Sequence, residues 1–446
     1  MLITNGKIIT WELENQILEN YSLLIYDGKI IEMGNTDQMR QRYPQEEILD
    51  AHGQYVMPGN ICAHTHFYGA FARGLAIPSA APKDFPEILQ KLWWPLDRSL
   101  THEDIRLSTQ VMLADAIRHG TTTLIDHHAS PNAIEGSLDV IADTVTQAGV
   151  RAVLCYEVTD RDGEAKAQAG IRENIRFIER LQKQPEPLLR ASFGLHASLT
   201  LSDATLDACR NAAPAGVGFH IHAAESEADQ YDSLAKSGLR VVDRLQRHGI
   251  LGENTILAHC VHTDAREAEI LAESGSWVTH QPRSNMNNAV GVAPVESLMR
   301  IGVPVCLGTD GFTSTMWEEW KFAYLLQKVW HHDPRRMPAD LVADMAIYNN
   351  AALTGRFFRD APIGIIQAGA VADLIFVDYH PHTELTPQNL PWHIVFGFHE
   401  SMVTMTMVNG KVLMKERRLL TIDEEEIASA ARRFSQQTWQ RYNAQF

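Results

Sequence analysis

Residues 118–126 read RHGTTTLID, and this short stretch shows the unit from which the middle of the chain is built. A helical pattern ends at Gly120, and a run of β-forming residues, Thr121–Asp126, follows at once. Glycine suits the left-handed position that closes a helix, and a strand with few charged residues is typical of a parallel sheet buried on both faces. The stretch therefore predicts a helix that leads directly into a buried parallel strand.

The same unit recurs along the chain, with a glycine between the helical pattern and the strand. Five further copies precede strands predicted at Val150–Glu157, Val217–His222, Thr255–Cys260, Ser276–His280 and Val303–Leu307. Two more predicted strands, Tyr55–His66 and Leu188–His196, bring the number to about eight. Eight parallel strands that alternate with helices are what a (β/α)8 barrel requires. We therefore predict an α/β fold with a TIM-like barrel over residues 56–362.

The two ends of the chain show a different pattern. Residues near 2–9, 22–33 and 47–50 alternate apolar and polar positions around turns, and residues 372–377 and 402–413 do the same. Such alternation is typical of short strands with one buried face. We therefore predict a small β-sandwich assembled from residues 1–55 and 363–446, of which the second part ends in a helix.

The charge balance and the cysteines limit the kinds of partner that we expect. The 446 residues hold 39 basic and 55 acidic side chains, a net charge of −16 that argues against a nucleic-acid partner. No apolar run approaches the roughly 18 to 20 residues that span a bilayer. The five cysteines include no Cys-x-x-Cys pair, and four lie in apolar runs, where a reduced, buried thiol is expected. We expect a soluble, cytoplasmic protein that binds neither nucleic acid nor membrane.

Two histidines close the first predicted strand of the barrel. His64 and His66 are two positions apart, and such residues on a strand point to the same side. Alone, this spacing is more often explained by packing or hydrogen bonding than by metal binding. The pair ends a strand, however, and that is where barrel enzymes place their active residues. Both imidazoles can therefore converge on one point.

Later strands end in the same way. His222 ends one predicted strand, His259 and His280 end the next two, and Asp310 follows the last. Each alone could be a buried, hydrogen-bonded side chain, but several strand ends that all deliver a titratable group favour a common site. Glu225, three residues after His222, is out of phase with that strand and must reach the site from a loop. That placement suits a carboxyl group that moves a proton.

Other histidines keep more than one interpretation. His220 lies one layer deeper than His222, and we interpret it as structural or as support behind a ligand. His127 and His128 follow the second strand, where either could bind a metal, although a hydrogen-bonded rim fits better. His196 ends the fourth strand and has either a structural role or a contact with substrate or with metal-bound water.

A long connection, residues 69–100, follows the first barrel strand and is rich in proline and tryptophan. A connection of this length at this position is often a lid or a substrate wall, although simple packing over the barrel is an equal alternative. Trp94, Phe67 and Tyr68 could stack on a flat heterocycle or belong to the core. Arg283 could pair with a carbonyl or carboxylate group.

The ordered set of these residues resembles the amidohydrolase superfamily, and in particular its deaminase and chlorohydrolase branch, which includes guanine and S-adenosylhomocysteine deaminases. The set comprises His64-x-His66, His222 with Glu225, His259 and Thr309-Asp310. A closer similarity is to the aminohydrolases associated with selenium-dependent purine catabolism. The shared segments are Leu92–Arg98, Asp126–Pro131, Arg283–Asn288 and Glu318–Phe322. One departure is Gln281, where many deaminases of this branch have Asn in a His-Asn-Pro motif.

The resemblance implies one divalent metal ion with four ligands: His64, His66, His222 and Asp310. Binuclear members of the superfamily bridge two metals with a carbamylated Lys on a central strand, but neither Val150–Thr159 nor Leu188–Leu199 contains a Lys. We therefore expect a mononuclear site. Zinc is the expected ion for three histidines and a carboxylate with an open position, although Fe²⁺ or Mn²⁺ would fit the same ligands.

The resemblance also implies hydrolytic deamination of an amino-substituted N-heterocycle of purine or pterin type. In that mechanism a metal-activated water attacks the ring, Asp310 accepts its proton, Glu225 protonates a ring nitrogen and His259 stabilises the tetrahedral centre. The expected substrate contacts are Trp94, His196 and Arg283.

Two alternatives remain open, and one further property follows by analogy. The same site could remove chloride from a heterocycle or open a cyclic amide. An inactive scaffold protein would be expected to lose metal ligands, whereas this chain keeps all of them together with Glu225. Related enzymes are often dimers, so we expect a homodimer.

Overall fold

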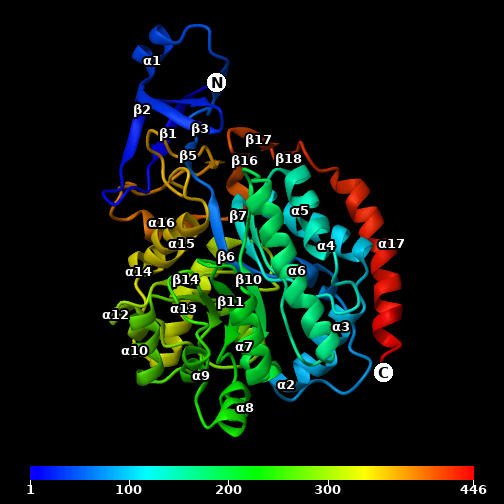
Figure 1. The fold of residues 1–446 in the computed structure, drawn as a ribbon. Coiled ribbons are helices and arrows are strands. Elements are labelled where there is room, and N and C mark those ends of the chain that lie inside the picture. The colour runs from blue at the N-terminus through cyan, green and yellow to red at the C-terminus, as the bar shows by residue number, and fades with distance from the viewer.

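The computed structural model describes residues 1–446 and shows an α/β protein whose parallel strands lie in two sheets (Figure 1). The first sheet has four strands in the order β6-β7-β8-β9, and the second has five in the order β10-β11-β12-β13-β14. Every neighbouring pair within these sheets is parallel. This confirms the predicted α/β class with parallel strands. The strands are β6 (Asn60–Thr65), β7 (Thr121–Asp126), β8 (Arg151–Leu154), β9 (Leu189–Ala191), β10 (Phe193–Ala197), β11 (Phe219–Ala223), β12 (Ile256–His259), β13 (Trp277–His280) and β14 (Val305–Leu307).

Isolated backbone bridges join the two sheets at both of their edges. Thr65, at the end of β6, pairs with Asp310 after β14. Val158, beyond the end of β8, pairs with Leu195 on β10. The carbonyl oxygen of His64 also accepts a hydrogen bond from the backbone N–H of Asp310 at 3.0 Å. The first and the last parallel strands are thus tied together at their carboxyl ends.

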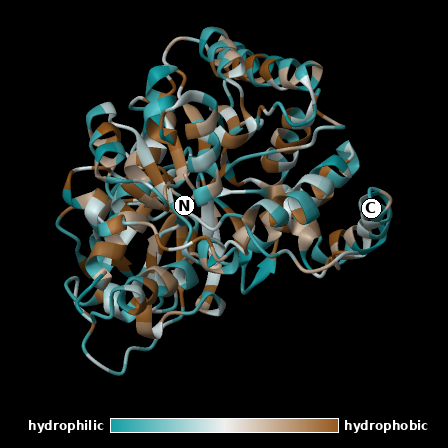
Figure 2. Ribbon diagram, turned by 90° about the horizontal axis from the view of Figure 1, so that it is seen from below, coloured by the Kyte–Doolittle hydropathy of each residue, from teal (hydrophilic) through white to brown (hydrophobic).

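Helices cover the outer sides of the parallel sheets (Figure 1). Figure 2 shows the apolar segments gathered around the central strands, with hydrophilic segments on the outer helices. Gly149 closes α5 with a φ of 85°, and Gly275 closes α10 with a φ of 67°, which confirms the predicted helix–glycine–strand unit at both positions. The helices of this layer are α4 (His102–Arg118), α5 (Ser137–Ala148), α6 (Glu164–Lys183), α7 (Asp203–Ala212), α8 (Glu227–Ser237), α9 (Val241–Arg247), α10 (Ala265–Ser274), α11 (Pro282–Asn287), α12 (Val295–Arg300), α13 (Met316–His331), α14 (Ala339–Ala343) and α15 (Asn350–Phe357).

Strands from both ends of the chain form a separate, nine-stranded sheet, at the top of Figure 1. Its order is β18-β17-β16-β15-β5-β1-β2-β3, and β4 pairs with β1. This sheet has a buried apolar cluster of its own, which includes Ile8, Val56 and Phe376. The predicted short strands at both ends are therefore present, while their arrangement as a sandwich stays a prediction. The strands are β1 (Leu2–Ile9), β2 (Ile17–Tyr26), β3 (Lys29–Asn35), β4 (Ile48–Asp50), β5 (Tyr55–Pro58), β15 (Leu374–Val377), β16 (Val403–Val408), β17 (Lys411–Lys415) and β18 (Arg418–Leu419), and the helices of the end segments are α1 (Thr36–Arg42), α16 (Leu390–Gly397) and α17 (Glu424–Asn443).

The prediction of one continuous strand over Tyr55–His66 was wrong. The segment holds two strands: β5 pairs with β1 and β15 of the terminal sheet, and β6 pairs with β7 of the first parallel sheet. The break falls at Gly59, where a Cβ atom would lie only 2.2 Å from the side chain of Thr122. Only glycine fits this close approach, and the chain passes there from one sheet to the other.

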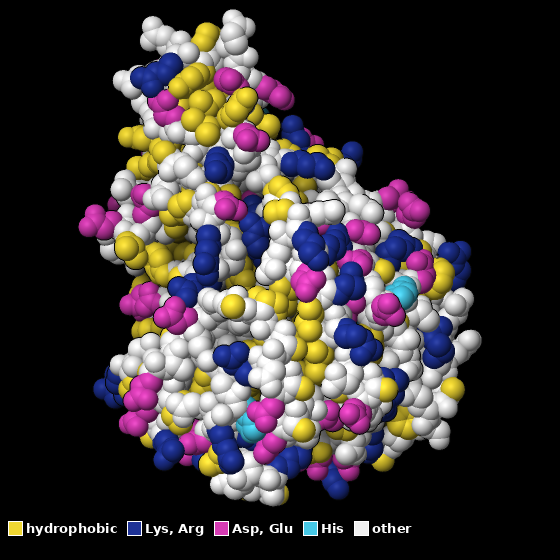
Figure 3. Space-filling view, in the orientation of Figure 1, with side chains coloured by type: hydrophobic (Ala, Val, Ile, Leu, Met, Phe, Trp, Pro, Cys, Tyr) yellow, Lys and Arg dark blue, Asp and Glu magenta, His cyan; other side chains and the backbone are white.

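The surface and the cysteines agree with an ordinary globular chain. Figure 3 shows acidic and basic side chains interspersed on one face, so the net charge of −16 is not gathered there in one patch. None of the helices combines the length and the apolar character that a membrane span needs. All five cysteines are free and buried, which confirms the predicted state of these thiols.

A buried ion pair links the first parallel sheet to the terminal sheet. Arg151 on β8 donates to both carboxylate oxygens of Asp373, at 2.8 and 3.2 Å, and both side chains are only 3% exposed. Asp373 lies directly before β15 and also accepts a hydrogen bond from the backbone N–H of Asn409 at 2.7 Å. Both oxygens of this carboxylate are therefore occupied in a region that excludes water.

We expect Asp373→Ala to lower the free energy of unfolding by about 3–5 kcal/mol, because it leaves the Arg151 guanidinium buried without its partner. The matched control is Asp360→Ala, since Asp360 pairs with Arg190 at 2.9 Å but is 84% exposed, and we expect a loss of less than about 1 kcal/mol there. Urea denaturation followed by circular dichroism measures both. Equal effects in the two variants would contradict a structural role for the buried pair.

Candidate functional site

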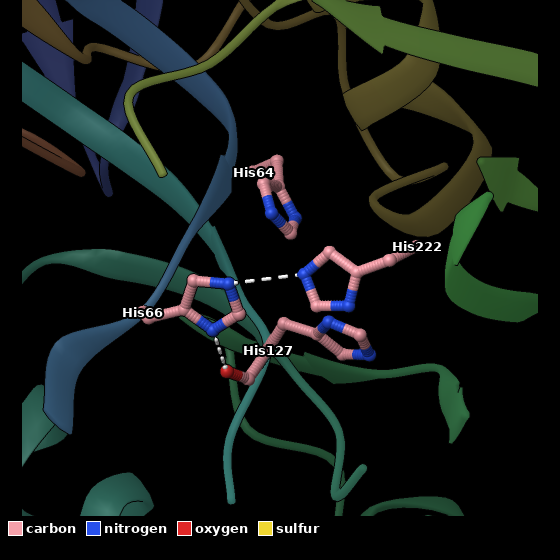
Figure 4. A group of neighbouring side chains, drawn as sticks. All are labelled: His64, His66, His127 and His222. Carbon is pink, nitrogen blue, oxygen red and sulfur yellow. Dashed lines mark hydrogen bonds between the residues drawn. The ribbon is translucent and has the colours of Figure 1, made fainter. Parts of the chain in front are cut away.

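Four side chains from three strand ends meet at the carboxyl ends of the parallel strands: His64, His66, His222 and Asp310. Figure 4 shows the three histidines together with the neighbouring His127. Nε2 of His66 lies 3.2 Å from Nε2 of His222 and 3.2 Å from Oδ1 of Asp310. Nε2 of His64 lies 4.0 Å from the same Asp310 oxygen and has no hydrogen-bond partner. Two ligand atoms bound to one tetrahedral zinc ion are ~3.3 Å apart, so the two contacts of His66 match the spacing of a divalent metal site and His64 lies slightly further out.

The other ring nitrogens of the three histidines are held from behind. Nδ1 of His64 lies 2.9 Å from Nε2 of His220, which is thus placed directly behind it. Nδ1 of His66 donates to the carbonyl oxygen of His127 at 2.5 Å, and Nδ1 of His222 donates to the carbonyl oxygen of His196 at 2.8 Å. Such contacts fix the tautomer and orientation of a ligating imidazole. The Nε2 atoms of His66 and His222 therefore face the common centre.

The backbone is strained where the site residues leave their strands. His259 has a φ of 77° and Asp310 a φ of 55°, in the left-handed region that residues other than glycine seldom adopt. Each such residue costs about 1–3 kcal/mol, and strain of this kind clusters at functional sites, where the surrounding structure enforces it. Here it turns both side chains inward from the ends of β12 and β14.

Glu225, His259 and Asp310 form one contiguous group beside the four donors. Nε2 of His259 lies 3.5 Å from Oε2 of Glu225 and 3.7 Å from Oδ2 of Asp310. Glu225 is 8% exposed and lines the cavity described below, as Asp310 does. The imidazole of His259 thus stands between the two carboxyl groups.

The two carboxyl groups have opposite proton affinities. Burial, and then the negative charge of Asp310, raise the pKa of Glu225 to about 8. Burial alone would raise the pKa of Asp310 too, but its hydrogen bond to His66 and the nearby histidines hold that pKa well below its usual value. Near neutral pH the site therefore contains one proton donor and one proton acceptor, a division of roles that acid–base catalysis requires.

A short segment around α11 contacts all three of these groups. Ser284 donates to Oδ2 of Asp310 at 2.5 Å. Oδ1 of Asn285 accepts the Nδ1 proton of His259 at 2.8 Å, and Asn288 donates to Oε1 of Glu225 at 3.3 Å. Sequence reasoning assigned no role to these side chains. The available signal was an amide-rich run directly after the strand that ends at His280.

Arg283, an expected substrate contact, points away from the cavity. Its guanidinium contacts Glu318 and Glu319, and it also donates to the hydroxyl of Thr315 at 2.8 Å and to the carbonyl oxygen of Thr313 at 2.8 Å. The side chain is 5% exposed, and its hydrogen-bonding groups are occupied by the protein itself. The structure thus places Arg283 behind α11, where it fastens this helix to α13.

A cavity of about 400 Å³ opens above the four donors. His66, His222, Glu225 and Asp310 reach it from the strand ends, and His196 lines it as well. The connection after β6 supplies an apolar wall of the cavity that includes Trp94, while its role as a substrate wall or a lid stays a prediction. The wall residues are Tyr68, Phe85, Leu89, Leu92, Trp93 and Trp94. Phe67, by contrast, is fully buried in the core.

The remaining histidines are buried near the centre. Both ring nitrogens of His127 lack a hydrogen-bond partner, and its ring stacks on that of His220 with centroids 4.3 Å apart. Nε2 of His128 contacts the hydroxyl of Ser130 at 3.0 Å, as a rim residue would. Neither ring nitrogen of His280 has a partner. These residues surround the donor group, and His127 comes near enough to join it.

Glu157 is a buried acid that sequence reasoning missed. It follows β8, is 1% exposed, and places Oε1 3.3 Å from Nδ1 of His66. Burial would raise the pKa of this group, but its contact with His66 and the electrostatic effect of the neighbouring histidines lower it to about 2, so it is ionised. The sequence held a signal for it, because Glu157 is the last residue of the strand predicted at Val150–Glu157, but no role was assigned to it there.

Comparison with known families fits this arrangement. The model of the amidohydrolase family matches residues 55–413. The chain belongs to the amidohydrolase family. This amidohydrolase is 32% identical to a 5'-deoxyadenosine deaminase of Methanosarcina mazei, over 100% of this chain and 99% of the relative. It is 33% identical to a 5-methylthioadenosine/S-adenosylhomocysteine deaminase of Syntrophobacter fumaroxidans, with 97% of each chain covered.

Solved structures show the same fold for this amidohydrolase. A zinc-bound adenosine deaminase of Xanthomonas campestris superimposes with a TM-score of 0.86, 25% identity and 98% coverage of both chains. A zinc-bound atrazine chlorohydrolase of Arthrobacter aurescens superimposes with a TM-score of 0.80 and 22% identity, over 97% of this chain and 99% of the other. At that identity the second likeness concerns the fold alone.

We expect Asn285→Ala to reduce turnover by about 100-fold or more, because His259 loses the acceptor that fixes its tautomer, and acid–base groups contribute roughly 10²–10⁴ in rate. Metal content should stay unchanged, since Asn285 touches none of the four donors. The control is Met286→Ala, the next residue on α11, whose side chain is 45% exposed. Steady-state kinetics together with elemental analysis measure the effect; turnover close to that of the unmodified protein would contradict the positioning role.

Proposed function

We propose that this amidohydrolase is a mononuclear, metal-dependent aminohydrolase that removes the amino group from an aminopurine-type heterocycle. The observation that carries the proposal is the placement of His259 between Glu225 and Asp310, at 3.5 and 3.7 Å. A protonated and an ionised carboxyl group flank one imidazole beside a four-donor metal site, and this is the set of groups that replacement of an amino group by water needs.

The metal ligands in this proposal are His64, His66, His222 and Asp310. Three imidazole nitrogens and one carboxylate oxygen favour zinc, while Fe²⁺ or Mn²⁺ suit the same donors. Zinc in the related adenosine deaminase supports this choice. A bound divalent ion would lower the pKa of a water molecule towards about 7 and so make hydroxide available at neutral pH.

The side chains of the protein then move the protons. Asp310 accepts a proton from the attacking water, and Ser284 holds its Oδ2 in place at 2.5 Å. The protonated Glu225 donates to the ring nitrogen beside the attacked carbon. His259, with its Nδ1 proton held by Asn285, offers Nε2 as an acceptor and can carry positive charge next to the developing tetrahedral centre. Asp310 then passes the proton taken from water to the amino group, and collapse of the tetrahedral centre breaks the C–N bond and releases ammonia. The remaining hydroxyl proton returns to Glu225, which leaves a carbonyl on the ring.

The cavity supports a flat, nitrogen-containing substrate. Trp94 and Tyr68 offer aromatic surface, and His196 offers a ring nitrogen beside the donor group. The relatives named for their substrates act on adenine-containing nucleosides, which supports an aminopurine ring here. Arg283 is left out of the substrate site, because its guanidinium is occupied behind α11.

Other features of the protein belong to the same proposal. The bridges at both edges support one closed (β/α)8 barrel over residues 56–362, with residues 1–55 and 363–446 packed as a β-sandwich. We also propose a homodimer located in the cytoplasm, with no nucleic-acid partner. The five free cysteines support a reducing compartment. Analytical ultracentrifugation tests the oligomeric state.

The function is tested by ammonia release from a panel of aminopurines, adenine nucleosides and pterins. We expect release from at least one compound by the zinc-loaded protein and none after the metal is stripped by a chelator. Chloride release from a chlorinated heterocycle, or a ring-opened acid, in place of ammonia would replace deamination by one of the alternative hydrolytic reactions. A purified protein that binds no metal would contradict the proposal and favour an inactive scaffold.

We expect Glu225→Gln to leave metal content intact and to reduce turnover by roughly 10²–10⁴-fold, because the amide cannot deliver a proton to the ring. The matched control is Glu227→Gln, two residues further on, where the side chain is exposed at the start of α8. Retained activity in Glu225→Gln would remove this residue from the mechanism.

A further inference from the structure

Asp229 is a buried acid in the wall of the cavity that the mechanism above does not use. It lies in the first turn of α8 and is only 2% exposed. Its Oδ2 accepts a hydrogen bond from the backbone N–H of Ala224 at 2.7 Å, and its Oδ1 accepts one from the backbone N–H of Leu199 at 2.7 Å. The two carboxylate oxygens therefore hold the main chain of two different loops at the cavity.

These two contacts differ from ordinary helix capping. Asp229 is the third residue of α8, and an acid at that position in a capping box accepts from the backbone of the N-cap residue. The N-cap of α8 is Ser226, whose own side chain accepts from the backbone N–H of Ala228. Asp229 reaches past the cap instead, to the residue that precedes Glu225 and to a turn after β10. Stabilisation of α8 alone therefore does not explain its position.

Ala224, the first of the two partners, is a strained residue that determines where Glu225 points. It has a φ of 49°, in the left-handed region that residues other than glycine seldom adopt. Its N–H is held by Asp229, and its carbonyl oxygen accepts from the backbone N–H of His262 at 2.9 Å. The peptide groups on both sides of this residue are thus fixed, and the chain leaves β11 in the direction that brings Oε2 of Glu225 to 3.5 Å from Nε2 of His259.

Leu199, the second partner, gives Asp229 a fixed support. It lies in the turn Ser198–Thr200 that follows β10, and it lines the cavity. Its N–H is held by Asp229, and its carbonyl oxygen accepts from Nζ of Lys236, near the other end of α8, at 2.7 Å. The helix is therefore fastened to this turn near both of its ends, which opposes a shift of Asp229 along the cavity wall.

Direct contact with the substrate is the competing role, because Asp229 lines the cavity. Each of its oxygens, however, already accepts a hydrogen bond of 2.7 Å from a backbone N–H. Buried N–H groups that lose their acceptor destabilise the protein, so these bonds are not readily exchanged for bonds to a ligand. The observed partners therefore favour a role in holding the chain over a role at the substrate.

We propose that Asp229 is a positioning residue for proton transfer by Glu225, and that it acts by fixing the left-handed conformation of Ala224. The inference rests on the proposed function, since it takes Glu225 to be the proton donor. Misplacement of a reacting group by about 1 Å costs up to about 100-fold in rate. Asparagine at this position has one acceptor oxygen in place of two, so one of the two N–H groups would face an amide NH₂ group and the chain before Glu225 would shift.

The test is a double-mutant cycle with Glu225. Asp229→Asn is introduced into the zinc-loaded, otherwise unmodified protein and, separately, into Glu225→Gln. Ammonia release is measured with 5'-deoxyadenosine, the compound for which one relative is named, or with the panel compound that the protein turns over fastest. The assays run for hours, so that the residual turnover of Glu225→Gln is measured as well. Calorimetry gives the Kd of the same compound in the Glu225→Gln background with and without Asp229→Asn.

The matched control is Glu173→Gln. Glu173 is also 2% exposed, and its two oxygens also accept from two backbone N–H groups, those of Gly136 and Leu138, at 3.1 Å each. It lies on α6 and is not among the residues that line the cavity. Asp229→Glu is a second variant in the same cycle, because it keeps the negative charge but displaces both oxygens by one methylene group.

We expect Asp229→Asn to lower kcat by about 100-fold in the unmodified protein but by less than about 3-fold in Glu225→Gln, because no proton donor is left to position there. The Kd and the metal content should stay unchanged. Asp229→Glu should also lower kcat only while Glu225 is present. Glu173→Gln should lower the melting temperature and leave kcat unchanged.

The proposal is overturned if Asp229→Asn retains the kcat of the unmodified protein, or if its loss is equally large in both backgrounds, as a merely structural role requires. A Kd weakened by about 10-fold or more would assign Asp229 to the substrate instead, and full activity of Asp229→Glu would show that charge rather than position matters. Failure of both Asp229 variants to fold, while Glu173→Gln folds, would also overturn it. Ammonia release by the unmodified protein is scored separately, so the deaminase function can stand while this inference falls.

Discussion

The backbone hydrogen bonds that join the end of β14 to the end of β6 are the constraint on which the site depends. The carbonyl oxygen of His64 accepts from the N–H of Asp310, and the bridge between Thr65 and Asp310 fixes the register of the two strands. Because all the parallel strands end at the same edge, these backbone hydrogen bonds hold the ends of β6 and β14 side by side. Oδ1 of Asp310 thereby comes within 3.2 Å of His66, although the two residues stand far apart in the sequence.

Bringing titratable side chains together at the ends of β6 and β14 has an electrostatic cost, and contacts among these side chains offset it. Several histidines and three acids are buried within a few ångströms of one another, and burial disfavours the charged form of each. Pairing decides which groups keep a charge: Asp310, against His66, stays ionised, while Glu225, beside the negative charge of Asp310, holds its proton. The same geometry that gathers metal donors therefore also separates the acid from the base.

The four metal-donor residues could be predicted from the sequence, but most of the residues that hold the site groups in place could not. His64, His66, His222 and Asp310 lie at or just beyond the ends of predicted strands, where a period of two and a common sheet edge determine where side chains point. Ser284 lies on α11 and Asn288 follows it, where no strand period applies and only the folded segment brings them inward. Glu157 ended a predicted strand, but its role could not be read there, because its contact with His66 forms only in the folded chain. The continuous strand expected over Tyr55–His66 failed for a related reason, since the break at Gly59 is set by the distant side chain of Thr122. Arg283 was expected at the substrate because an arginine near a site suggests an anion, but its carboxylate partners come from α13.

This displacement of Arg283 explains how a six-residue helix can position three reactive groups. The helix α11 is too short to be stable by itself, since isolated helices below about 12 residues are marginal. Arg283 fastens it from behind to Glu319, which is fully buried, while Ser284, Asn285 and Asn288 face Asp310, His259 and Glu225 from the front. Its two faces are thus coupled: a shift of α13 would move the Arg283 anchor and, through it, all three hydrogen bonds at once. The precision of the acid–base group accordingly depends on an ion pair that never touches the substrate.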